Sequence, residues 1–134
     1  MARQLTDDAK TLDGLAQFYP STLATASQTA KTADYTVLAT EMGTNFTNSG
    51  ASGTVVFTLP AAARCPNKTV KFSCLAAQIV RVDPSGTEKI YLHGSGVAGK
   101  YLNIAAVIGN YADLFCDGLN WHVTYLAGVV TKEA

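Results

Sequence analysis

The sequence of 134 residues contains few charged side chains, and their signs balance. Asp, Glu, Lys and Arg make up 15% of the chain, with ten basic and ten acidic residues, so the formal net charge is zero. Nucleic acids and anionic membranes usually select partners with a basic surplus, so the composition argues against both. The surface must be formed largely by Thr, Ser, Asn, Gly and Ala, which suggests packing against copies of the protein or against another rigid assembly.

Long apolar runs are absent as well. Between Met1 and the acidic pair Asp7 and Asp8 there is no apolar core of the kind found in a secretory signal peptide. No run approaches the roughly 18 residues that span a bilayer. We therefore expect synthesis in a reducing cytoplasm, with the cysteines buried as small hydrophobic residues. They are Cys65, Cys74 and Cys116. A disulfide between Cys74 and Cys116 is the alternative.

No set of residues has the spacing of a catalytic or metal site. The only histidines, His93 and His122, are far apart in the sequence, and neither His nor Cys recurs at the spacing of a zinc site. Cys74 and Cys116 fall at apolar positions, where thiols are unreactive. The pattern does not bring together an acid, a base and an oxyanion donor. We predict a protein that is not an enzyme and that has no cofactor and no metal.

One glycine-rich stretch, Gly94-Ser95-Gly96-Val97-Ala98-Gly99, has the form G-x-G-x-x-G of dinucleotide-binding proteins. That fingerprint requires a helix whose N-terminus receives the pyrophosphate. Residues 100–108 have room for only a short helix before Gly109, so we interpret the stretch as a turn. We expect an exposed contact surface close to it, and its residues are Tyr91, His93, Asn120 and His122.

From Tyr35 onward, apolar and polar residues alternate with a period of two, which indicates strands with one buried face. The candidate strands span residues 35–40, 55–59, 70–74, 79–82, 88–93, 111–116 and 119–125. Turn sequences separate them, including the hairpin signal Asp117-Gly118. Such spacing occurs in sandwiches, barrels and solenoid-like folds. We predict an all-β fold over residues 34–134, a compact antiparallel β sandwich or barrel-like domain.

Aromatic residues recur through the candidate strands, and we expect them in the core rather than on a ligand platform. They are Tyr35, Phe46, Phe57, Phe72, Tyr101, Phe115 and Trp121. Asn45 and Asn67 match the glycosylation acceptor pattern. Since no signal peptide is evident, we expect these two simply as loop residues.

Residues 1–33 follow a different pattern. Thr6 is a candidate N-cap followed by two acids, and apolar residues recur at helical spacing up to Pro20. This predicts a short amphipathic helix. Residues 21–34 contain one large apolar side chain, Leu23, and cannot fold alone. We interpret the region as an extended arm, with an apolar anchor at residues 12–19 on a spacer; an ordinary flexible terminus is the alternative.

Five segments resemble, in their order, a β module of tailed-bacteriophage virion proteins, which include head fibres, capsid decoration proteins and parts of tail fibres. The segments are Tyr35-Thr36-Val37-Leu38, residues 50–62 with the core Val55-Val56-Phe57-Thr58-Leu59-Pro60, residues 77–86 with Arg81-Val82-Asp83-Pro84-Ser85-Gly86, Gly99-Lys100-Tyr101-Leu102, and residues 116–123 with Asp117-Gly118-Leu119-Asn120-Trp121. The resemblance extends from about Asp34 to Leu126. The first 33 residues lie outside it.

This resemblance implies a homotrimeric, non-enzymatic β domain displayed on a virion. The short chain with an anchor and a spacer favours a capsid decoration protein of the cement or head-fibre type, made in the host cytoplasm and bound to the outer surface of the bacteriophage head. Its partners would be the major capsid protein and copies of itself. The expected capsid-binding residues are Leu5, Leu12, Leu15, Phe18, Tyr19 and Leu23.

Two other functions remain open. A tail-fibre or spike module would bind a host-surface carbohydrate receptor through the loops around His93 and Asn120. Tail fibres are normally longer and contain coiled-coil or repeated shaft segments, which this sequence does not contain. A soluble binding module of a cell is the other alternative.

Overall fold

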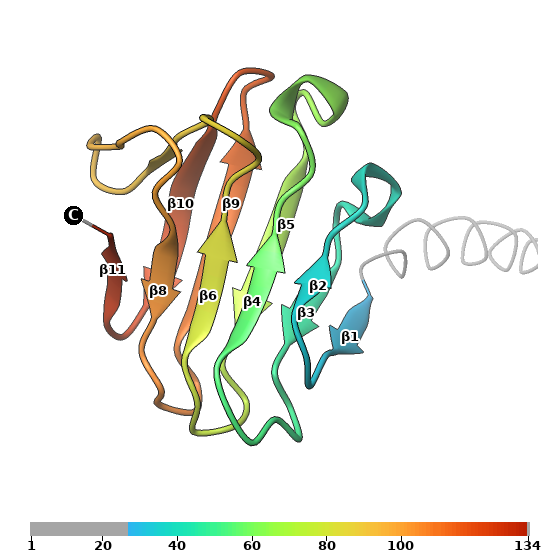
Figure 1. Cartoon of the computed structure of the whole chain (residues 1–134), viewed down its shortest axis with the longest axis vertical. Helices are drawn as coiled ribbons and strands as arrows, with labels where there is room; N and C mark the ends of the chain where they lie inside the picture. Colours follow the sequence, from blue (N-terminus) through green and yellow to red (C-terminus); the bar gives the residue numbers. More distant parts are fainter. Residues whose placement is uncertain (1–26, 134) are drawn as a thin grey trace, which may run out of the picture.

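The structure, a computed structural model, describes residues 27–133 and consists of two β sheets that pack face to face (Figure 1). The six-stranded sheet has the order β1 (Gln28–Ala30), β3 (Asn45–Thr47), β5 (Thr69–Ser73), β9 (Tyr111–Cys116), β10 (Trp121–Ala127) and β7 (Ile90–Tyr91). The five-stranded sheet has the order β11 (Val130–Lys132), β8 (Leu102–Ile104), β6 (Val80–Asp83), β4 (Val55–Thr58) and β2 (Tyr35–Thr36). Two 3-10 turns, η1 (Ala39–Glu41) and η2 (Ala62–Arg64), lie in connections.

From β1 to β9 the chain crosses from one sheet to the other after every strand. As a result β1, β3 and β5 are parallel neighbours in one sheet, and β2, β4 and β6 are parallel neighbours in the other. Each pair of strands, β1–β2, β3–β4 and β5–β6, therefore forms one coil of chain stacked on the next. The C-terminal strands β8 to β11 add antiparallel pairs, including the β9–β10 hairpin.

The all-β prediction is confirmed, but the prediction of an antiparallel domain is wrong in part. Five strand pairings are parallel, and four are antiparallel. A period of two reports only that one face of a strand is buried. Parallel sheets usually have two buried faces and continuous apolar runs, whereas here each sheet buries only the face that meets the other sheet. The alternation therefore does not distinguish the two arrangements.

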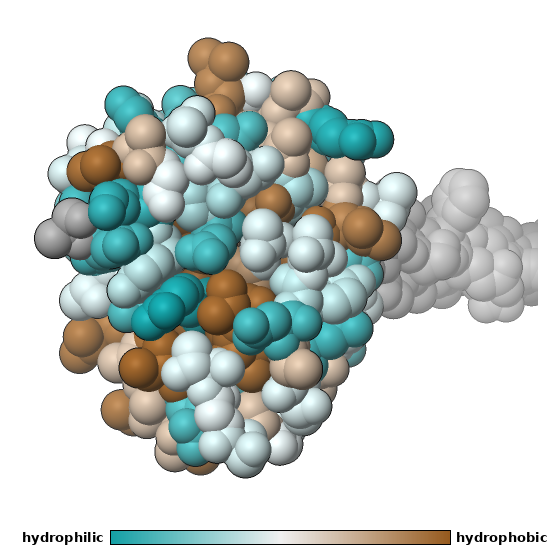
Figure 2. Space-filling model, in the orientation of Figure 1, coloured by the Kyte–Doolittle hydropathy of each residue, from teal (hydrophilic) through white to brown (hydrophobic). Residues whose placement is uncertain are grey.

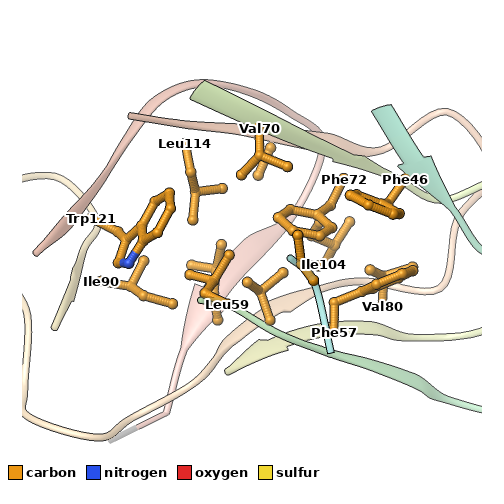
Figure 3. Packing of buried hydrophobic residues seen from close by; sticks show 14 of the residues in the cluster. Phe46, Phe57, Leu59, Val70, Phe72, Val80, Ile90, Ile104, Leu114 and Trp121 are labelled. Atoms are coloured by element: carbon orange, nitrogen blue, oxygen red, sulfur yellow. The ribbon is translucent and has the colours of Figure 1, made fainter. Parts of the chain in front are cut away.

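The strand register builds a ladder of aromatic side chains in the core (Figure 3). Phe46 lies opposite Phe72 on β3 and β5, with ring centroids 5.9 Å apart. Phe57 reaches across from β4, with its ring 5.5 Å from Phe46 and 5.2 Å from Phe72. Such aromatic pairs contribute about 0.5–1.5 kcal/mol each beyond their buried area. Trp121, which is fully buried, lies at the other end of the core, beside Ile90 and Leu114 (Figure 3).

Tyr35 closes this ladder at the first coil. Its ring lies 5.8 Å from Phe46, and the Lys31 ammonium lies 3.8 Å from its ring centroid on the outer side. The Tyr35 hydroxyl donates a 2.6 Å hydrogen bond to Glu41, which contributes most to the raised pKa of Tyr35. Tyr101 and Phe115, in contrast, are not core residues. Both are only half-buried and lie on outer faces of the sheets.

Several predicted elements differ in extent from the structure. The predicted strand 35–40 is wrong beyond Thr36, because Glu41 accepts a 2.8 Å hydrogen bond from the Leu38 amide and the chain turns into η1. Residues 88–93 form only the short strand β7, and the stretch 100–108 contains a strand that was not predicted, β8. Asn45 lies in β3 and not in a loop.

The three cysteines are buried and free, so the alternative of a Cys74–Cys116 disulfide is wrong. The Cys74 thiol donates to the carbonyl of Ala76 at 3.0 Å, and the Cys116 thiol donates to the carbonyl of Ala62 at 3.2 Å. Burial raises the pKa of the Cys65 and Cys116 thiols. The predicted burial of all three cysteines is confirmed, and the raised pKa keeps the Cys65 and Cys116 thiols protonated.

Candidate functional site

The predicted contact surface lies at one edge of the six-stranded sheet, where β7 pairs with β10. Tyr91 on β7 lies directly opposite His122 on β10, and their rings stack with centroids 5.0 Å apart and planes 15° apart. Gly96 also lies against the Tyr91 ring, since a Cβ at Gly96 would be 3.0 Å from Tyr91 Cδ1. The Tyr91 ring therefore contacts both His122 and the glycine-rich turn.

Asp117 in the β9–β10 turn anchors the histidine. Its Oδ1 accepts hydrogen bonds from the Leu119 and Asn120 amides at 2.8 and 2.7 Å, and its Oδ2 lies 2.7 Å from His122 Nε2. The Asn120 amide, followed by His122 and the Leu119 amide, lowers the pKa of Asp117 to about 2. The carboxylate thus stays ionised and holds His122 in place at ordinary pH.

Asn120 also has a structural role. Its side-chain oxygen accepts a 2.8 Å hydrogen bond from the Lys89 amide and so ties the turn to the chain just before β7. His93 takes part in neither the ring stack nor these hydrogen bonds. It is exposed at the tip of the turn between Leu92 and Ser95, with φ of 53°. The structure therefore brings together three of the four predicted contact residues and leaves His93 separate.

The ring stack and the hydrogen bonds of Asp117 hold this cluster together. His122 and Asp117 expose 39% and 37% of their side chains, but the hydrogen bonds within the cluster already fix both groups. The stacked rings and the hydrogen-bonded carboxylate form a partly exposed surface that is suited to contact with a partner.

Further aromatic residues, which the sequence analysis did not assign to a site, extend this surface across the outer face of the sheet. Phe115 lies opposite His122 on β9, and Tyr125, which is 70% exposed, lies opposite Asp113. On β5, the Lys71 ammonium lies 4.2 Å from the Tyr111 ring centroid. These aromatic residues could have been noticed from their alternate positions in the strands 111–116 and 121–127. The alternation alone, however, does not reveal which face of a strand is buried.

A groove of two open pockets runs along the connections that follow β2 and β4; we call it the edge groove. The first pocket has a volume of about 430 Å³. It is lined by residues 36–40, Pro60, Ala61 and Arg64. The second, of about 360 Å³, shares Ala39 and Thr40 and is also lined by Met42, Gly43 and residues 67–69. No sequence pattern indicated the edge groove, because the fold alone brings these connections together.

The opposite end of the domain exposes apolar side chains, and we call it the apolar end. The connections 48–54, 74–79, 105–110 and 128–129 contain no Asp, Glu, Lys or Arg. Four large apolar side chains there are between 38% and 63% exposed: Leu75, Val107, Ile108 and Val129. Backbone hydrogen bonds from Ala105 to Val129 and from Gly109 to Cys74 join the connections. Figure 2 shows brown atoms at the lower left, where Figure 1 places the β10–β11 turn.

The N-terminal segment joins the domain at the other edge of the six-stranded sheet, through β1. The Ser27 carbonyl accepts a 2.7 Å hydrogen bond from the Asn45 amide, and the Ser27 hydroxyl lies 3.3 Å from that of Thr44. The predicted short helix lies outside the described residues. So do the expected capsid-binding residues Leu5, Leu12, Leu15, Phe18, Tyr19 and Leu23.

Within residues 27–133, no group of His, Cys, Asp or Glu side chains is arranged to hold a metal ion. The same part of the chain contains no helix long and apolar enough to cross a membrane. Neither the comparison with protein-family models nor the search of curated proteins finds a match to this sequence.

Proposed function

We propose that the protein is a non-enzymatic structural protein of a bacteriophage virion. In this proposal, the N-terminal segment ahead of β1, residues 1–26, attaches the protein to the outer surface of the assembled head as a decoration protein of the cement or head-fibre type, and the β domain is displayed outside. The observation that carries the proposal is the placement of two features on the six-stranded sheet. The N-terminal segment joins through β1 at one edge, and the Tyr91–His122 cluster lies at β7 and β10 by the other edge.

The apolar end supports the association of copies that the resemblance implies. Exposed apolar patches of this kind mark interaction surfaces, and a patch without charges can meet its own copy about a symmetry axis without repulsion. An oligomer would contain several N-terminal segments. Their individually weak contacts with the shell would together give strong binding. A protein that binds only the assembled shell also stabilises it by mass action.

The attachment is tested by removing residues 1–26, which leaves β1 in place on β3. We expect the truncated protein to keep its cooperative unfolding transition but to stay in the supernatant when sedimented with empty heads of the phage that encodes it. Tyr125→Ser, on the displayed face, serves as the control and should sediment with the heads like the full chain. Sedimentation of the truncated protein would disprove the proposed role of the segment.

Association through the apolar end is tested separately by light scattering. Ile108→Asp places a charge in the patch, and we expect the mass in solution to fall to that of one chain. Leu119→Asp makes the same change at a residue that is 75% exposed at the other end of the domain, and it should leave the mass unchanged. An unchanged mass for Ile108→Asp would exclude this surface.

The outer face of the six-stranded sheet favours a second candidate, a tail-fibre or spike module that binds a host-surface carbohydrate. Tyr125, Phe115 and Tyr111 provide exposed or half-exposed rings, and such rings offer apolar surface to sugars, with polar groups of Asp113 and Lys71 beside them. Screening of the full chain on a glycan array tests this candidate. Binding that is lost in Tyr125→Ser would support it, and the absence of binding would count against it.

A further inference from the structure

We propose that the edge groove binds an apolar part of this chain's own N-terminal segment, residues 18–23. This inference goes beyond the attachment to a capsid, because the docking occurs within the free protein and needs no other partner. Phe18, Tyr19 and Leu23 are the large apolar side chains of that stretch. Residues 18–23 would then have two alternative contacts, the edge groove of the free protein and an external surface.

The edge groove has the properties of a peptide-binding surface. Leu38 exposes 54% of its surface at the groove, and Val37, Pro60 and Ala61 add further apolar lining to the first pocket. Among the described strands, β2 is the last of its sheet, and within residues 27–133 no strand pairs with the outer side of its backbone. The pocket volumes of about 430 and 360 Å³ fall within the usual range for binding sites, roughly 300–1,000 Å³.

The chain reaches the groove at the point where its described part begins. Ser27 contacts Thr44 and Asn45, and the adjacent Gly43, which lines the second pocket, donates a 2.7 Å hydrogen bond to the Thr69 carbonyl. A chain spans at most about 3.3–3.6 Å per residue. The chain therefore allows Leu23 to lie up to roughly 14 Å from Ser27, and Phe18 up to roughly 32 Å, by the same rule. This range starts beside the second pocket and extends along the groove.

Covalent linkage favours the same occupant. Residues 18–23 contain no charged side chain, so the contact rests on their apolar side chains and on the attachment of the segment to the domain. Because the segment is covalently attached, its effective concentration at the groove is on the order of millimolar. A contact too weak to bind a separate peptide would therefore be occupied within one chain.

The inference is tested by changing one side of the contact and measuring the other. In the full chain without any capsid, amide hydrogen exchange is followed by mass spectrometry for groove residues 36–40 and 61–64 and for residues 15–26. We expect the double variant Phe18→Asp, Leu23→Asp to speed exchange in the groove at least about threefold. Leu38→Asp should speed exchange in residues 15–26 by a similar factor.

Matched variants show whether the effect is specific. Leu5→Asp introduces a charge in the segment outside residues 18–23, and it should not change amide exchange in the groove. Leu119→Asp introduces a charge in the domain outside the groove, and it should not change amide exchange in residues 15–26. If neither test variant affects exchange across the contact, the proposal is wrong. Protection that disappears on dilution to single chains would assign the groove to a segment of another copy and would also overturn it. Sedimentation with heads is a separate measurement, so either proposal can fail without the other.

Discussion

Tyr91 and His122 come from parallel strands and stack with ring centroids 5.0 Å apart. Gly96 lies against the Tyr91 ring, and Asp117 Oδ2 lies 2.7 Å from His122 Nε2. One ring pair thereby connects the glycine-rich turn, the sheet edge and the β9–β10 turn. The glycine of this stretch thus has a packing role that does not involve a nucleotide.

Gly96→Ala tests this packing. The added Cβ would lie 3.0 Å from Tyr91 Cδ1 and 3.1 Å from the Ile90 carbonyl, so we expect a loss of about 1–3 kcal/mol in the free energy of unfolding, measured with urea. Gly53→Ala is the control, because no atom lies within 4 Å of its Cβ position. It should be neutral or stabilise by up to about 1 kcal/mol. Equal stability of the two variants would mean that the turn relaxes freely.

Asn48→Ala tests a buried polar side chain that organises the apolar end. Its oxygen accepts from the Leu75 and Ala76 amides at 2.7 and 2.9 Å, and its nitrogen donates to the Ala76 and Gln78 carbonyls. Removal leaves two amides without partners, and we expect a loss of about 2–4 kcal/mol in the free energy of unfolding. Asn103→Ala, which removes one hydrogen bond to Arg81 at a half-buried site, should cost less than about 1 kcal/mol.

Asp117→Asn tests the electrostatics of the cluster. The pKa of Asp117 falls from 3.8 to about 2 on folding, so its charge stabilises the fold above pH 3.8 and this contribution is lost as the pH falls towards 2. Wild type should exceed Asp117→Asn in stability by less than about 1 kcal/mol at neutral pH, since the site is exposed. Thermal unfolding from pH 7 to pH 2 should show this difference vanish.

Asp113→Asn provides the control of opposite sign. Burial raises the pKa of Asp113 above 3.8 despite the nearby Lys71, so its charge opposes folding at neutral pH and the penalty disappears in acid. The variant should therefore be more stable than wild type at pH 7 and equal to it at low pH. Parallel pH profiles for the Asp117→Asn and Asp113→Asn variants would contradict both assignments.

Local patterns predicted much of the strand content but little of the connectivity. Residues 55–59 and 111–116 form β4 and β9 almost as predicted, because alternation reports burial of one face. Asp117-Gly118 makes the predicted hairpin turn, with Gly118 at φ of 93°. The parallel coils depend on which strands meet across 17 or more residues, as when Gln28 pairs with Asn45, and no local pattern encodes that choice.

The candidate site was predictable to a similar extent. Tyr91, Asn120 and His122 come together because each lies beside a turn or strand end that the sequence identifies. The edge groove and the contacts of Asn48 were missed, since both join segments that are distant in the chain. Asn48 and Leu75, for example, meet only because β3 and β5 are neighbours. Polar residues in loops give no advance sign that they will be buried.

Because the domain is built from stacked coils, its width can change by the insertion or removal of whole coils. The strands of successive coils lie in register, so an inserted coil between β3–β4 and β5–β6 would meet the same ladders on both sides. Each additional coil would move β1 about 4.8 Å further from β7 and β10. Gene duplication or deletion of a single coil could thus set the separation between the chain's point of attachment and its opposite edge without altering either one.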